Sequence, residues 1–533
     1  MDRVTDLTTE YDAIFVGGGH NALAAAIILS RKGWTVGMFE LNPVVGGSVQ
    51  TRELTLPGFR HDIAAMNLSL FAGSPFHQEF AAELSEHGLE FTPVNDCFAS
   101  VFPEGKWVGI SSDIEVSCIC LEKFSKSDSQ RWRTMVARFG DIAPHLFGML
   151  GSPMTPWSLA KSAFKAWRFG GVKFVAEMAK LLLSSPRKFL NENFESTELK
   201  VALASWGMHL DFPPDQAGGA MFPYLEGMAN QSFGMVIGKN GADTMIKAMV
   251  GMAEASGCRI HTDCEVVEIL TDTNKATGIM LRDGRVVISK SAVITSVAPS
   301  NLCSKLLSNG SGDENFDDAM KKFEHAPGTM MIHLALDSKL EWQAGKDLET
   351  FAYVHVAPTM RTMAEAYTQA MDGLLPATPV IVVGQPTAID PDRAPEGKHI
   401  LWVQVRVLPA NIEGDAKGEI DGTDWDDIKG QYYERVLDIL ENYTPGIRSK
   451  IIGKAVFSPL DLQRENPNLV GGDQICGSHH LTQNFLFRPT FGWSDWKTPI
   501  KNLYQIGAST WPGAGVGAGS GTMLAHKLAG KGR

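Results

Sequence analysis

The sequence predicts an α/β fold with two domains, a discontinuous Rossmann-like domain and a second domain that combines a mixed sheet with helices. Three observations indicate this. The chain opens with an apolar strand, a glycine turn, a helix and a second strand; it closes with a strand, a glycine-rich turn and a helix; its middle holds short β-rich runs and a helical block. The 533 residues, 44% of them hydrophobic, suffice for more than one core.

The opening turn carries the first chemical signal. An apolar run at 13–16 is followed by three glycines and by an alanine-rich helix at 22–29. Gly17 permits a tight turn and Gly19 lets the backbone approach a pyrophosphate, which fits the G-x-G-x-x-A pattern of dinucleotide-binding turns. A helix N-terminus adds free amides and a positive dipole end. The predicted binding residues here are Gly17, Gly19, His20, Asn21 and Ala22, where Ala22 allows close helix packing.

Two further features extend this site. Glu40, followed by Leu41, ends the second strand about 20 residues after the turn, where a carboxylate accepts hydrogen bonds from ribose hydroxyls. Gly46 and Gly47, followed by Ser48, give a second close backbone approach, which NAD does not need. The doublet therefore favours a flavin dinucleotide, FAD.

The C-terminal region is the second strong signal. Residues 502–506 form a predicted strand, residues 507–521 contain six glycines, and residues 522–529 are helical. A helix N-terminus facing the flavin pyrimidine would stabilise negative charge on the reduced ring. The binding residues predicted here are Gly507, Ala508, Gly515 and Val516.

Strands from the middle of the chain complete the predicted nucleotide domain, with Ser296 at a strand end. The backbone of Val266 is a candidate contact for adenine, although a valine at such a position more commonly packs in a core. We expect this FAD-binding domain to be discontinuous, with residues 1–75, 238–305 and 485–533. The substrate-binding domain then comprises 76–237 and 306–484, with a helical block at 157–190 that is interrupted at Gly170 and Gly171.

The second domain has β-rich runs at 330–336, 351–357, 379–383 and 400–407. In the last run, Leu401, Val403, Val405 and Val407 alternate with Trp402, Gln404 and Arg406. Such alternation predicts a sheet with one covered face.

Composition excludes several classes of protein. The formal charge of −12 opposes binding to nucleic acid, and seven scattered cysteines give no metal-binding spacing. No run of about 20 apolar residues could span a bilayer. The first eleven residues lack a signal or transit pattern, so we expect a cytoplasmic protein.

Three segments resemble a known family: residues 16–26 with Gly46-Gly47, residues 488–504, and residues 512–516. They are similar to the phytoene desaturase and carotenoid isomerase-related FAD-dependent oxidoreductases, in particular to the branch of pyridine nucleotide-disulphide oxidoreductase domain-containing protein 2. The resemblance implies noncovalent FAD that takes a hydride from a largely apolar small organic substrate. The electron acceptor, oxygen or a quinone, stays open.

Two positions depart from that branch, where we expect histidine. Trp511 precedes Pro512, and Cys476 precedes Gly477. A side chain beside the flavin therefore has a changed role. Trp511, His479, His480 and His61 are the catalytic candidates to inspect.

Dehydrogenation of a C–H bond is the first hypothesis for the reaction. Amine oxidation is the alternative, with an aromatic cage from Trp493, Trp496 and Trp511, although the first two also suit packing under a loop. A flavin-bearing binding or scaffold protein is a third hypothesis.

The helical block is basic in an otherwise acidic protein. Between 157 and 188 it carries seven Lys or Arg and one acid, Glu177, beside apolar residues such as Trp167, Phe169 and Phe174. The pattern suits peripheral contact with an anionic membrane. It also suits, and on general grounds better, packing on its own domain or a homo-oligomer interface.

Overall fold

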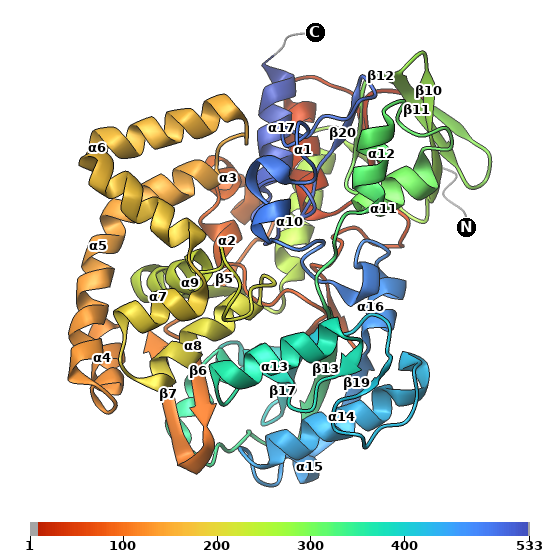
Figure 1. The fold of residues 1–533 in the computed structure, drawn as a ribbon. Coiled ribbons are helices and arrows are strands. Elements are labelled where there is room, and N and C mark those ends of the chain that lie inside the picture. The colour runs from red at the N-terminus through yellow and green to blue at the C-terminus, as the bar shows by residue number, and fades with distance from the viewer. Residues whose placement is uncertain (1–8, 531–533) are drawn as a thin grey trace.

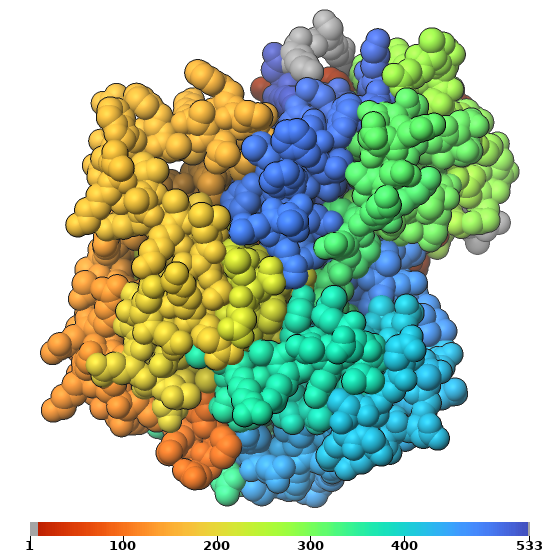
Figure 2. All heavy atoms as spheres, in the orientation of Figure 1, coloured from red at the N-terminus to blue at the C-terminus, as the bar shows by residue number. Residues whose placement is uncertain are grey.

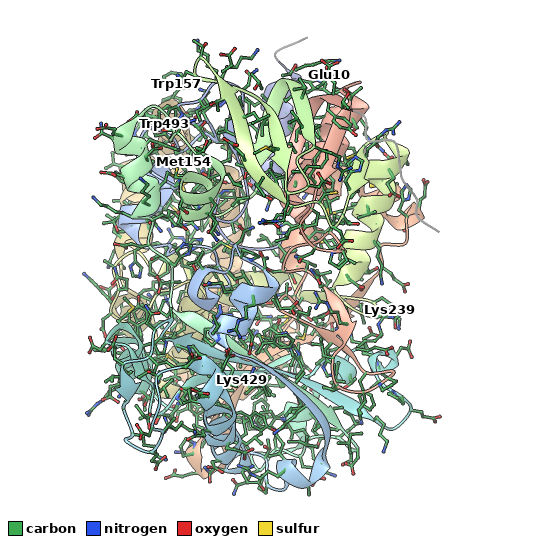
Figure 3. All side chains as sticks on the ribbon, turned by 90° about the vertical axis from the view of Figure 1, so that its right-hand side faces the viewer. Glu10, Met154, Trp157, Lys239, Lys429 and Trp493 are labelled. Atoms are coloured by element: carbon green, nitrogen blue, oxygen red, sulfur yellow. The ribbon has the colours of Figure 1, made fainter. Side chains whose placement is uncertain are left out.

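The computed structural model describes residues 9–530, which fold around two seven-stranded sheets at opposite ends of the molecule (Figure 1). Figure 3 shows this separation from the side. Glu10, in the first sheet, lies near the top, and Lys429, on a helix that flanks the second sheet, lies in the lower half. The predicted α/β fold is confirmed.

The first sheet has the order β10-β11-β12-β1-β2-β9, and β20 pairs with the end of β12. β12 is parallel to β1 and β20, and β1 is parallel to β2. The strands are β1 (Glu10–Val16), β2 (Val36–Phe39), β9 (Arg259–His261), β10 (Val266–Asp272), β11 (Lys275–Leu281), β12 (Val286–Thr295) and β20 (Leu503–Gln505). Three distant segments of the chain therefore build one sheet, while the domain boundaries stay a prediction.

Helices from both ends and from the middle of the chain cover this sheet. They are α1 (His20–Arg31), α3 (Pro75–Glu86), α10 (Asp243–Ala255) and α17 (Gly519–Ala529), with the short α2 (Ser69–Ala72), α11 (Pro299–Asn301) and α12 (Glu314–Lys321) nearby. Ten of the twelve residues of α1 are buried, because the helix lies between the sheet, α10 and α17. The alanine-rich sequence of α1 allows that close packing.

The second sheet has the order β19-β13-β17-β16-β14-β6-β7. Its strands are β6 (Asp96–Phe102), β7 (Lys106–Ser111), β13 (Gly328–Leu336), β14 (Tyr353–Val356), β16 (Val380–Gly384), β17 (His399–Leu408) and β19 (Ile451–Phe457). Flanking helices are α13 (Met360–Met371), α14 (Trp425–Glu441), α15 (Ile447–Lys450) and α16 (Pro459–Glu465).

The prediction of one covered face for this sheet is wrong. Every residue of β13 and β16, and all but the first of β17, is buried. Leu401, Val403 and Val405 pack in the core with α14, whereas Trp402, Gln404 and Arg406 line an internal cavity. The polar side of β17 faces that cavity instead of bulk water.

A helical layer stands beside both sheets. It comprises α4 (Ile114–Glu122), α5 (Lys126–Leu150), α6 (Pro156–Leu183), α7 (Pro186–Asn193), α8 (Thr197–Met208) and α9 (Met221–Phe233). The predicted interruption of the helical block is confirmed, since Gly170 and Gly171 have non-helical backbone angles inside α6. Small ribbons complete the fold: β3 (Thr51–Glu53) with β4 (Arg60–Asp62), β5 (Phe91–Val94) with β8 (Met235–Gly238), and β15 (Leu374–Leu375) with β18 (Gly414–Asp415).

Candidate functional site

One continuous cavity of about 1390 Å³ reaches from the first sheet to the second. Val16 and Phe39 line it at one end, Tyr353 and Trp402 at the other. Pockets for one small ligand are typically about 300–1,000 Å³. This cavity therefore has room for more than one ligand group.

The predicted glycine turn lines one end of the cavity. Gly17 has φ +94°, a conformation that favours glycine, and a Cβ on Gly19 would meet nothing within 4 Å, so the turn is open to a ligand. His20 and Asn21 also line the cavity, at the N-terminus of α1. Ala22 does not line it and is fully buried in the core, as its predicted packing role requires.

Glu40 is fixed against this turn. Its Oε2 accepts a hydrogen bond from the Gly18 amide at 2.7 Å and its Oε1 accepts one from the Asn42 amide at 2.9 Å. Burial raises the pKa of Glu40, while the two amides favour its charged form. Each oxygen keeps a lone pair, and both Glu40 and Leu41 line the cavity, where ribose hydroxyls can reach the carboxylate.

The remaining predicted binding residues of the middle segments lie along the same wall. The Gly46 amide donates to the Gly18 carbonyl at 2.9 Å, which holds the glycine doublet against the turn. Ser296 donates from Oγ to the Val16 carbonyl at 3.2 Å, also beside the turn. Gly47, Ser48 and Val266 are cavity-lining residues too.

Asn21 joins the two glycine-rich ends of the chain. Its Oδ1 accepts hydrogen bonds from Ser520 Oγ at 3.0 Å and from the Gly521 amide at 3.3 Å. Ser520 Oγ in turn accepts one from the Gly507 amide at 2.8 Å. The C-terminal residues Gly507, Ala508, Gly515 and Val516 thereby line the same cavity as the opening turn.

The donors at this end fit a dinucleotide. Burial lowers the pKa of His20 to about 4, so the imidazole is neutral. In the described part of the chain, Lys305 and Arg406 are the only lysine and arginine side chains that line the cavity. The charge of a pyrophosphate would be met mainly by backbone amides and the dipole of α1, as in dinucleotide-binding folds.

Trp511 lines the cavity and is only 1% exposed. Its Nε1 donates to the Ser152 carbonyl at 2.8 Å, which links the C-terminal turn to the segment after α5. Trp496 Nε1 donates to the Trp511 carbonyl at 3.0 Å. The predicted position of Trp511 against flavin or substrate stays a prediction.

His479 is hydrogen-bonded to the C-terminal glycine-rich turn. The Ala514 amide donates to His479 Nε2 at 3.0 Å, so the proton of the neutral ring is on Nδ1. Burial keeps the pKa of His479 well below its ordinary value. His479 lines the cavity, but its acceptor nitrogen is engaged, which suits a positioning role better than that of a base.

The structure places the other two histidines outside the cavity lining. His61 shares a hydrogen bond with Thr55 Oγ1 at 2.8 Å, and His480 Nε2 bonds to the Asp211 carbonyl at 2.7 Å. Trp493 and Trp496 are also packing residues outside the lining. The three tryptophans do not form a cage around one ligand.

Sequence reasoning missed the polar wall at the far end. Glu226 of α9 lines the cavity, and its hydrogen-bond partner within the described chain is Asn230 Nδ2 at 3.3 Å. Burial raises the pKa of Glu226 to about 7. The alternation along β17 was the one signal for this wall, since it marked Gln404 and Arg406 as a separate side.

Arg488 was also missed. It is fully buried and donates to five backbone carbonyls, of which Ser478 at 2.7 Å and Ala508 at 2.7 Å are the nearest. The others belong to Cys476, Gly477 and Gln483. Arg488 thereby ties the His479 segment to the C-terminal turn.

A G-x-G-x-x-A turn, a carboxylate held against it and a second glycine turn on one cavity are the arrangement expected of an FAD-dependent oxidoreductase. The chain belongs to the flavin-containing amine oxidoreductase family, whose sequence pattern matches residues 23–516. FAD is accordingly the cofactor. Gly17–Gly19, Glu40, Gly46–Gly47 and Gly507–Val516 are the residues that would hold it.

Individual relatives agree with this assignment. The chain is 26% identical to pyridine nucleotide-disulfide oxidoreductase domain-containing protein 2 of Rattus norvegicus, over 98% of this chain and 93% of that one. It is 22% identical to a neurosporene-forming phytoene desaturase of Cereibacter sphaeroides, over 97% and 94%. An oxidoreductase structure from Methanosarcina mazei shares the fold, with a TM-score of 0.59, 19% identity and coverage of 97% and 99%.

Proposed function

We propose that this FAD-dependent oxidoreductase dehydrogenates a largely apolar small organic substrate. Bound FAD supplies the hydride acceptor, at flavin N5, and a base or water takes the accompanying proton. The observation that carries the proposal is the apolar lining beyond the glycine turns, given by Leu150, Met221, Phe222, Leu225 and Ala229. Such a wall buries an apolar body and excludes water.

The electrons then pass to oxygen or a quinone. Amine oxidation is the less supported alternative, because Trp493 and Trp496 lie outside the cavity lining and cannot form the expected aromatic cage with Trp511. FAD is held noncovalently in this proposal, through backbone amides and Glu40.

An anaerobic flavin-reduction screen tests the substrate class. Purified protein should lose flavin absorbance with one or more members of a panel of apolar hydrocarbons and alcohols, and should regain it on addition of oxygen or a quinone. Acid precipitation should release intact FAD to the supernatant. Reduction by primary amines alone would replace the dehydrogenation proposal by amine oxidation, and flavin retained in the pellet would contradict noncovalent binding.

We further propose that α6 rests on an anionic membrane surface. No helix in residues 9–530 is long and apolar enough to cross a membrane. Figure 2 shows α6, in gold, at the edge of the molecule with a hollow behind it. Trp157 is 81% exposed and lies near the upper edge of Figure 3. The other exposed large apolar residues of α6 are Phe164, Trp167, Phe169, Val172 and Leu183.

Charge supports the same surface. Lys161, Lys165, Arg168 and Lys173 are exposed and have no ion-pair partner among the described residues. Each cation near an anionic bilayer contributes about 1 kcal/mol. The cavity opens close by, because Phe147, near the end of α5, is both exposed and a lining residue. An apolar substrate could then enter from the lipid.

Sedimentation with vesicles of phosphatidylserine and phosphatidylcholine at low and moderate salt tests this surface. Wild type should pellet, less at moderate salt, and the variant with Lys161, Lys165, Arg168 and Lys173 changed to Gln should stay in the supernatant. A matched variant with Lys32, Lys126, Lys275 and Lys322 changed to Gln should pellet like wild type. Absence of vesicle binding by wild type would contradict the proposal. If the protein also forms dimers, that result would favour α6 as an oligomer interface.

A further inference from the structure

Arg406 occupies the inner end of the cavity wall. β17 points Trp402, Gln404 and Arg406 to the cavity, while the residues between them pack toward α14. Arg406 is 6% exposed in total, so its guanidinium is shielded from bulk water. A buried cation in such a place requires compensation.

The partners of Arg406 satisfy one edge of the guanidinium. Nη2 donates to the His209 carbonyl at 2.7 Å and Nε approaches the Met208 carbonyl at 3.5 Å, both at the C-terminus of α8. Nη1 has no acceptor among the described residues. Nη1 is not one of the fully buried polar atoms that lack a partner, so it is accessible from the cavity that Arg406 lines.

The other buried arginines are satisfied within the protein. Arg435 pairs with Asp415 at 2.6 Å and Arg393 pairs with Asp62 at 2.5 Å. Arg488 has no carboxylate partner, but all three of its guanidinium nitrogens donate to backbone carbonyls. Arg406 has no carboxylate within ion-pair distance in the described chain. Asp473, a nearby acid, is already occupied by the backbone amides of Ala326, Ile475 and Gly477.

We propose that Arg406 binds the carboxylate of a substrate whose remaining body is apolar. The proposal rests on the dehydrogenase function above and narrows its substrate class to hydrophobic monocarboxylic acids. The free side of the guanidinium, with Nη1 and the second Nη2 hydrogen, matches the two oxygens of a planar carboxylate. A phosphate monoester, with up to two charges, finds no second lysine or arginine at this end among the described lining residues, since Lys305 belongs to a turn that contacts β10 at the nucleotide end.

Titration of the FAD-loaded protein with decanoate and 1-decanol, followed through the absorbance of bound flavin, tests the proposal. Wild type should bind decanoate at least 10-fold more tightly than 1-decanol. Arg406→Gln should weaken decanoate about 10- to 100-fold, as expected for a charge-assisted hydrogen bond, and leave 1-decanol within about twofold. The affinity of Arg406→Lys for decanoate should lie between those of wild type and Arg406→Gln. Arg464→Gln removes an exposed cation paired with Asp426 and should match wild type.

Several results would overturn the proposal. Equal wild-type affinity for decanoate and 1-decanol, or an equal loss of both in Arg406→Gln, would leave Arg406 as a structural cap of α8. Tighter binding of decyl phosphate than of decanoate would reject the carboxylate. If Arg406→Gln does not retain FAD, the wild-type preference and Arg406→Lys decide the question. Absence of flavin from wild type would instead refute the cofactor assignment, a separate failure.

Discussion

At the scale of single residues, Glu226 is a carboxyl group whose surroundings disfavour its charge. Burial raises its pKa to about 7, and Asn230 is its hydrogen-bond partner. In the unfolded chain the pKa of a glutamate is about 4.3. The folded state therefore holds this proton more tightly, so the stability contributed by Glu226 is full below about pH 4.3 and is lost as the pH rises through 7.

We predict that Glu226→Gln raises the thermal unfolding midpoint relative to wild type at pH 8 but not at pH 4.5. The gain at pH 8 should correspond to about 1–3 kcal/mol, because the variant cannot carry the buried charge. Differential scanning fluorimetry across this pH range measures it. Glu86→Gln, at an exposed site, should have little effect at either pH. A difference independent of pH would contradict the prediction.

Trp511 combines a structural bond with a place on the cavity wall. We predict that Trp511→Phe slows substrate-driven flavin reduction about 10- to 100-fold through misplacement of the reacting groups, and changes FAD content far less. Stopped-flow reduction and flavin absorbance per protein give the two readouts. Trp157→Phe, at an exposed tryptophan, is the matched control. Equal reduction rates in wild type and Trp511→Phe would remove Trp511 from the reaction.

At the scale of elements, the crossing of α1 and α17 determines whether the two glycine turns meet. A Cβ on Gly521 would lie 1.9 Å from the Asn21 carbonyl oxygen. No side chain fits there, so the glycine is required by the helix contact itself. Asn21 then bonds Ser520 and Gly521 across the same contact.

We predict that Gly521→Ala separates these helices, lowers FAD occupancy and destabilises the fold by about 1–3 kcal/mol or more through overpacking. Gly430→Ala is the matched control in the interior of α14, where a Cβ would meet nothing within 4 Å. It should stabilise the protein by about 0.5–1 kcal/mol. Thermal unfolding and flavin content measure both variants. Retained flavin and an unchanged thermal unfolding midpoint in Gly521→Ala would contradict the prediction and show that α1 and α17 can adjust to the added methyl group.

At the scale of the whole molecule, sequence predicted the fold class, the cofactor and most strands near the glycine turns, because strand–glycine–helix order is a local signal. It could not predict what covers the second sheet. The alternation of Gln404 and Arg406 with apolar residues is the same whether the polar side faces water or a cavity. A single histidine belongs to no motif with a defined spacing, so the sequence could not distinguish His479, which lines the cavity, from His61 and His480, which do not. Arg488 was missed because its acceptors are backbone carbonyls, which no sequence pattern identifies.

The bond between Asn21 and Ser520 spans 499 positions of the chain, and this separation has a consequence for biosynthesis. At about 5–20 residues per second, a ribosome needs roughly 25–100 s to add the second partner after the first. During that time the opening strand, turn and helix have neither α17 nor β20 beside them. We therefore expect the vitamin-derived group to find its full set of neighbours only after residues 503–529 have been synthesised, because Gly507, Gly515 and Val516 line the same cavity as the opening turn.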